Sequence, residues 1–119
     1  VQYDYLYFCF RNDRPSRWGI LYAQKNSTIN WSTAAVTNMD YMFSSTTNFN
    51  KDIGSWNTAA VTFMGLMFHN ATAFNQDLSN WCVQTYFDTE PSLFKLGANS
   101  TWANDASKQP DWDGAACPP

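Results

Sequence analysis

An internal repeat constrains the fold of this chain more than any other feature. Trp31, Trp56 and Trp81 are equally spaced, and residues 31–55 match residues 56–80 at 13 of 25 positions without a gap. One such unit cannot cover its own apolar side, so neighbouring units have to stack and bury it between them. Equivalent residues should then lie above one another in columns.

Each repeat is expected to contain one short helix and one short strand. Apolar residues at i, i+3, i+6 and i+7 indicate one face of a helix, and Thr33 and Thr58 lie where an N-cap belongs. Residues 49–56 and 74–81 are the candidate strands, each pairing in parallel with the next. The sequence therefore predicts an α/β fold, a short solenoid with one parallel strand and one helix per repeat. Its predicted core consists of Trp31, Val36, Met39, Met42, Phe43, Phe49, Ile53, Trp56, Val61, Met64, Met67, Phe68, Phe74, Leu78 and Trp81.

Repeated polar residues are expected to serve the stack as well. Asn50 should lie over Asn75, and Asp52 over Asp77, forming polar ladders that satisfy the N–H groups of the turns. The alternative is functional: a row of carboxylates could bind cations, and the row of tryptophans could bind sugar rings.

Residues 1–30 precede the repeats and do not share their pattern. Residues 1–10 are strand-prone, residues 11–17 read as a polar loop, and residues 18–23 form a second candidate strand. Two interpretations stay open: a β-hairpin that caps the first repeat, or a strand that pairs with another copy of the chain. The residues expected to make the second contact are Tyr3, Tyr5, Leu6, Tyr7, Phe8 and Phe10.

Residues 81–119 are expected to form an irregular C-terminal cap, which completes a single domain over residues 1–119. Cys82 and Cys117 bracket this segment, and a disulfide between them would staple a cap that has little core of its own. Cys9 is then left over, either buried as a small apolar residue or bonded between chains.

Composition and motifs argue against several functional classes. A net charge of −3 disfavours a nucleic-acid partner, and no apolar run is long enough to span a membrane. The single histidine, His69, has no metal-ligand spacing around it and is expected to be a polar turn residue. No catalytic, metal or cofactor site is predicted.

Two sets of exposed polar residues remain as candidate sites. The only basic cluster is expected to be a hairpin tip or a contact for an acidic partner, and consists of Arg11, Arg14 and Arg17. Four asparagines occupy Asn-x-Ser/Thr motifs and would carry glycans in a eukaryotic secreted protein: Asn26, Asn30, Asn70 and Asn99.

The repeat motif resembles a known family. Residues 31–43 read Trp-Ser-Thr-Ala-Ala-Val-Thr-Asn-Met-Asp-Tyr-Met-Phe, and residues 73–81 read Ala-Phe-Asn-Gln-Asp-Leu-Ser-Asn-Trp. Over about residues 31–118 this pattern is similar to the BspA-like surface proteins, whose leucine-rich-repeat variant is shared with mycoplasma-type lipoproteins. The resemblance implies a leucine-rich-repeat-like fold and a non-catalytic extracellular role in adhesion or recognition.

Together these features predict a non-enzymatic structural or adhesive repeat protein, extracellular or at the cell surface. The expected partners are other copies of the chain, assembled through the N-terminal strand and the ends of the solenoid. The alternative is a monomeric recognition module that binds a host protein or a glycan.

Overall fold

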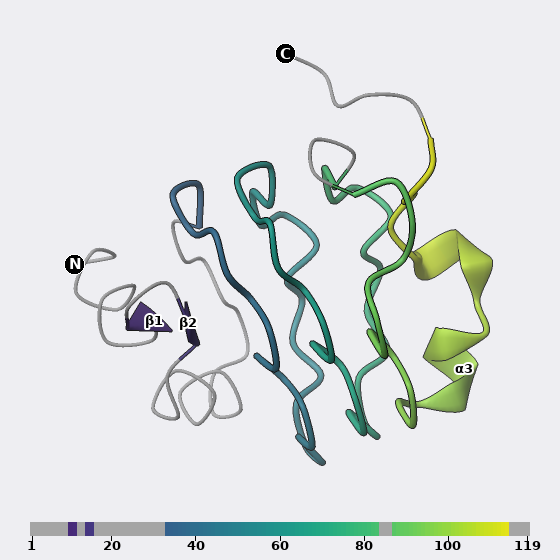
Figure 1. Cartoon of the computed structure of the whole chain (residues 1–119). Coiled ribbons are helices and arrows are strands. Elements are labelled where there is room, and N and C mark those ends of the chain that lie inside the picture. The colour runs from purple at the N-terminus through teal and green to yellow at the C-terminus, as the bar shows by residue number, and fades with distance from the viewer. Residues whose placement is uncertain (1–9, 12–13, 16–32, 84–86, 115–119) are drawn as a thin grey trace.

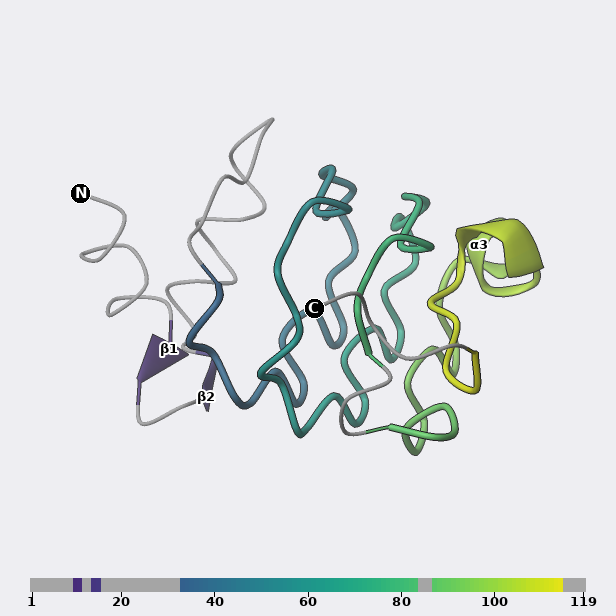
Figure 2. The same cartoon turned by 90° about the horizontal axis from the view of Figure 1, so that it is seen from above.

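The structure is a computed structural model that describes residues 10–11, 14–15, 33–83 and 87–114. Strands β1 (Phe10–Arg11) and β2 (Arg14–Pro15) pair antiparallel, helix α3 covers Ser100–Ala103, and the 3-10 helix η1 covers Ala106–Lys108. Most of the remaining described chain runs in turns and extended segments. Each repeat forms one pass of the chain across the molecule, and a further pass follows after Trp81. The passes lie side by side, from blue to green in Figure 1, and the same order is seen from above in Figure 2.

The helix predicted in each repeat is not formed, and residues 39–45 are mainly turns instead. A helix would direct each amide to the carbonyl four residues earlier. Every second amide here donates instead to a carbonyl of the following repeat, on the next pass. The bonds run from Met39, Tyr41, Phe43 and Ser45 to Phe63, Gly65, Met67 and His69, at 2.8, 3.1, 2.9 and 2.7 Å.

Local bonds between these amides close the turns. The amides of Met42 and Ser44 donate to the carbonyls of Met39 and Tyr41, three residues earlier, at 3.3 and 3.1 Å. Tyr41 and Ser45 have φ values of 63° and 61°, which a right-handed helix does not permit. The i, i+3, i+6, i+7 pattern of burial is therefore produced by a series of turns.

A third pass follows the two repeats, although the sequence pattern stops at Trp81. Its residues accept bonds from the second repeat: Leu66, Phe68 and Asn70 donate to Ser92, Phe94 and Leu96 at 3.1, 2.8 and 2.9 Å. The offset between donor and acceptor is two positions longer here than between the first two passes. An ungapped comparison at the 25-residue spacing therefore sets this pass out of register with the repeats.

The predicted strands at residues 49–56 and 74–81 are not formed either, and in the described part of the chain the one parallel pairing is an isolated bridge between Asn38 and Phe63. Side chains replace part of the backbone ladder, since the amide of Gly65 donates to Asp40 Oδ1 at 2.7 Å. The predicted α/β leucine-rich-repeat-like solenoid is therefore wrong. The passes contact one another without forming a sheet.

The predicted caps also need correction. The expected N-terminal hairpin pairs residues 1–10 with 18–23, but the described pair is β1 with β2, which begins at the last residue of the first expected strand and otherwise lies within the expected loop. Asn12 and Asp13 separate these strands, and both residue types favour tight turns. Of the predicted Cys82–Cys117 bridge that would staple the C-terminal cap, the structure describes only Cys82, which is disulfide-bonded; Cys117 and Cys9 lie outside the described residues.

Aromatic rings align from pass to pass in the core. Trp56 and Trp81 stack with centroids 6.5 Å apart and planes 2° from parallel, and Phe49 stacks on Phe74 at 5.7 Å and 4°. All members of the predicted repeat core within residues 33–83 are buried, while Trp31 lies outside the described residues. Equal spacing along the chain thus places like rings together.

Helix α3 covers the last pass. Asn99 caps it, its Oδ1 accepting from the amides of Thr101 and Trp102 at 2.9 and 3.3 Å. This places Trp102, which is completely buried, edge-on against Phe74 at 4.9 Å. The aromatic stack therefore ends on α3 at the C-terminal side.

Candidate functional site

The repeated threonines hold neighbouring passes together. The hydroxyl of Thr33 donates to the carbonyl of Asn57 at 2.9 Å, and that of Thr58 donates to the carbonyl of Cys82 at 2.8 Å. Both threonines are buried. Their predicted role as helix N-caps is wrong, because no helix follows them and their hydroxyls bond across the passes.

The repeated asparagines form the expected ladder. Asn50 Oδ1 accepts from the amide of Asn75 at 2.8 Å and from Gln76 Nε2 at 2.9 Å. Lys108 continues the row, its Nζ donating to Asn75 Oδ1 at 2.9 Å. The side-chain amides of these asparagines therefore form hydrogen bonds between neighbouring passes.

The aspartates bond within their own turns. Asp52 accepts from the amide of Gly54 at 3.0 Å, and Asp77 accepts from that of Ser79 at 2.8 Å. The side-chain and backbone bonds of Ser79, with a smaller contribution from the charge of Lys108, hold the pKa of Asp77 below its ordinary value of 3.8. The carboxylates thus stabilise individual turns.

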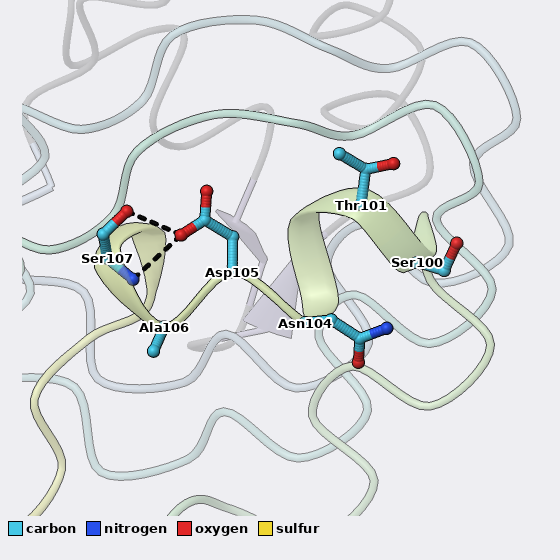
Figure 3. A pocket seen from close by; sticks show the side chains of 6 residues that line it. All are labelled: Ser100, Thr101, Asn104, Asp105, Ala106 and Ser107. Atoms are coloured by element: carbon cyan, nitrogen blue, oxygen red, sulfur yellow. Dashed lines mark hydrogen bonds between the residues drawn. The ribbon is translucent and has the colours of Figure 1, made fainter.

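A polar hollow lies beside α3 and η1 (Figure 3). Its wall is formed by Ser100, Thr101, Asn104, Asp105, Ala106 and Ser107. Asp105 Oδ1 already accepts from the amide and the hydroxyl of Ser107, at 3.0 and 2.6 Å. These two bonds lower the pKa of Asp105, so its carboxylate is part of a turn at the wall of this hollow.

Two rows of left-handed residues cross the three passes. When the amide of one residue donates to the carbonyl just before a second residue, the two residues lie side by side on neighbouring passes. The bridge between Asn38 and Phe63 has the same register. The first row, called here the apolar row, consists of Tyr41, Leu66 and Leu93, with φ values of 63°, 54° and 54°. The second consists of Ser45, Asn70 and Gly97, with φ values of 61°, 57° and 74°.

The residue types in the two rows differ in how well they suit this conformation. Glycine and asparagine adopt left-handed φ values readily, whereas each bulky residue in this region destabilises the fold by about 1–2 kcal/mol. Asn70 and Gly97 therefore fit the second row, but the bulky residues of the apolar row are strained. Backbone strain that persists in this way is commonly found at functional sites.

The apolar row is also open to solvent. Tyr41 and Leu93 are 56% and 48% exposed, and Leu66 is partly exposed. Two more exposed apolar residues lie three positions along the chain from members of the row: Phe63 before Leu66 and Leu96 after Leu93, each 56% exposed. Burial does not explain the apolar side chains of Tyr41 and Leu93, and backbone preference explains none of the three, which makes the face they share the candidate binding surface.

A shallow hollow of about 500 Å³ adjoins one end of the apolar row. Leu93 and Leu96 line it together with residues of α3, and Glu90 and Lys95 lie at its wall as an ion pair 3.1 Å long. The charges at this end of the surface are therefore paired with each other.

The sequence alone does not single out this surface, because a φ value above zero is not visible in residue types. The available signal is positional: Tyr41 and Leu66 occupy equivalent, solvent-facing places in two repeats. Apolar residues at such a place are atypical of a face whose other residues include Asp40, Ser44 and Ser45.

The residues proposed from the sequence are only partly placed. Phe10 pairs with Pro15 and Arg11 with Arg14 in the β1–β2 hairpin. Asn70 is exposed, and Asn99 caps α3. The remaining candidates lie outside the described residues: Tyr3, Tyr5, Leu6, Tyr7, Phe8, Arg17, Asn26 and Asn30.

The single histidine lies next to a serine of the neighbouring pass. His69 Nδ1 lies 3.5 Å from Ser44 Oγ, on the neighbouring pass. Within residues 33–83 and 87–114 and the two short strands, no three metal-ligating side chains gather at one place. None of the helices in this part of the chain has the length and apolar character to cross a membrane.

One protein family matches the part of the chain that contains the repeats. A family model described as "Mycoplasma protein of unknown function, DUF285" matches residues 21–105, which include both repeats and most of the third pass. No curated protein and no solved structure matches the chain. On the extent of the family match, the chain belongs to the DUF285 family.

Proposed function

We propose that this chain is a non-enzymatic structural or adhesive module that works by holding another macromolecular surface. The observation that carries the proposal is the apolar row. Three bulky residues occupy strained left-handed positions on a solvent-exposed face, where glycine or asparagine would give a more stable fold. Stability given up at an exposed apolar surface is typical of a contact site.

The repeated polar side chains support the same proposal. The hydroxyls of Thr33 and Thr58, the amide of Asn50 and the carboxylate of Asp77 all hold the passes or their turns in place. The repeat therefore acts as a scaffold, and the residues left for function are the exposed apolar ones.

We further propose that the repeats are of the BspA-like kind and that the protein acts outside the cell or at its surface. The resemblance of residues 31–43 and 73–81 supports the first statement. The exposed sequon at Asn70 is compatible with the second.

Immobilising the full chain and measuring binding tests the proposal. The probes are the chain itself, a glycan array and a panel of extracellular matrix proteins. Saturable binding to one of them, weakened when Leu66 or Leu93 is changed to Asn, is the expected result. An absence of binding to every probe would contradict the proposed function.

A further inference from the structure

We infer that the apolar row is a self-association surface, on which a second copy of this chain docks in antiparallel orientation about a two-fold axis near Leu66. This inference rests on the proposed function and names the partner. The row has three positions, with Leu66 in the middle and Tyr41 and Leu93 at its ends. A two-fold axis through the middle position pairs each end with the opposite end of the other copy.

The size of the exposed surface fits such a pairing. Taking about 200 Å² for each fully exposed large apolar side chain, the four exposed residues offer roughly 400 Å². One partner in a standard interface contributes about 800 Å², of which a little over half is apolar. The row, together with Phe63 and Leu96, therefore supplies about the apolar area that one half of a stable dimer needs.

The charges near the row permit two identical faces to meet. Asp40 Oδ1 accepts from the amide of Gly65 at 2.7 Å, and Glu90 is paired with Lys95. Only 14% of the whole chain is charged. Like charges that would oppose self-pairing are therefore few on this face, and no excess of one sign favours a strongly charged partner.

The C-terminal end of the stack is a poorer surface for a second copy. Trp102 on α3 covers Phe74, and Lys108 ends the row of asparagines by donating to Asn75. A lysine at the end of a ladder opposes the addition of a further unit there. This favours association through the face that carries the apolar row over end-to-end stacking at α3.

The test compares the full-length chain with its Leu66→Asn and Leu93→Asn variants. Asparagine tolerates the left-handed conformation, so both variants are expected to fold with an unchanged or raised melting temperature. Each substitution occurs twice in a symmetric dimer. We therefore expect the dissociation constant, measured by sedimentation velocity over a concentration series, to rise at least tenfold.

Ser45→Asn is the matched control, since it lies on the same pass as Tyr41 in the other left-handed row and should leave the dissociation constant within twofold. A wild-type chain that stays monomeric up to millimolar concentration overturns self-pairing, while binding to a glycan or matrix protein would still support the proposed function. A wild-type dimer that Leu66→Asn and Leu93→Asn leave unchanged also overturns the inference, because another surface then carries association. Loss of folding in both asparagine variants would refute the premise of strain.

Discussion

The indole Nε1–H of Trp81 donates to the backbone carbonyl of Ile53 at 2.9 Å, from one pass to the next. The bond is buried, and the Trp81 ring stacks on that of Trp56. One side chain therefore joins two passes by both a hydrogen bond and an aromatic contact. The same carbonyl also accepts from the amide of Trp56 at 3.2 Å, so changing Trp81 to Phe removes one of its two donors.

We expect Trp81→Phe to lower the free energy of unfolding by about 1–3 kcal/mol, since a buried acceptor loses a donor and part of the ring contact is lost. Equilibrium denaturation in urea measures the change. Phe74→Leu, which alters a stacked ring but no hydrogen bond, separates the loss of ring contact from the loss of the bond. Wild-type stability in Trp81→Phe would show that the indole bond contributes nothing.

Thr58→Val tests the bond between Thr58 and Cys82. Valine has nearly the same shape but cannot donate, so the carbonyl of Cys82 loses this donor and stability should fall by about 1–3 kcal/mol. Thr58→Ser keeps the hydroxyl and loses one methyl group, so its effect should be about 1 kcal/mol. Equal effects in the two variants, measured by thermal unfolding, would contradict a role for the hydroxyl.

The spacing of the passes can be tested at two glycines. A Cβ at Gly54 would lie 2.7 Å from the backbone carbonyl oxygen of Asp77, whereas a Cβ at Gly65 would lie 3.4 Å from the side chain of Asp40. Gly54→Ala should therefore destabilise the chain by about 1–3 kcal/mol, because backbone has to move. Gly65→Ala should be tolerated, and the reverse order of stability would be inconsistent with the described spacing.

The two turn aspartates predict a specific loss of stability in acid. Hydrogen bonds from Ser79 and Ser107 lower the pKa values of Asp77 and Asp105 below 3.8 in the folded chain. Groups with depressed pKa values stabilise the fold above the unfolded value, and this stabilisation is lost as pH falls through the folded value. Carboxyl NMR titration should therefore place both midpoints below 3.8. Ser79→Ala should raise the titration midpoint of Asp77 and leave the midpoint of Asp105 nearly unchanged. An unchanged midpoint for Asp77 in this variant would show that the Ser79 hydroxyl does not lower its pKa.

Strain in the apolar row can be measured apart from binding. Leu93→Asn should stabilise the monomer by about 1 kcal/mol, while Ser45→Leu places a bulky residue in the same conformation and should destabilise it by a similar amount. Chemical denaturation at a concentration where the chain is monomeric gives both values. If Leu93→Asn were less stable than wild type, Leu93 would not be strained.

The sequence predicts which residues form the core better than it predicts how the backbone is arranged. Val36, Met39, Met42 and Phe43 are buried, as one face of a helix would be. Their spacing cannot distinguish a helix from successive turns, because both place these residues inward. What separates the two is the acceptor of each amide, and for Met39 that acceptor is Phe63 on the next pass.

The candidate surface escapes sequence analysis for a related reason. Tyr41 and Leu66 are ordinary residue types, and only their φ values and mutual alignment identify the apolar row. The third pass is also hidden, since its hydrogen-bond offset differs from that of the repeat, as the bonds from Phe43 to Met67 and from Phe68 to Phe94 show. Hydrophobic spacing alone does not predict which residues of neighbouring passes lie side by side, because the hydrogen-bond register sets this alignment.

Backbone bonds in a fixed register join neighbouring passes, and the fold and the apolar row both depend on that register. NMR couplings across hydrogen bonds test this directly, since they link the amide nitrogen of a donor to the carbonyl carbon of its acceptor. Couplings are expected from the amide nitrogen of Met39 to the carbonyl carbon of Phe63, and from that of Phe68 to the carbonyl carbon of Phe94. Couplings from these amides to carbonyls four residues earlier would contradict this register, because they would mean that the repeats are helical.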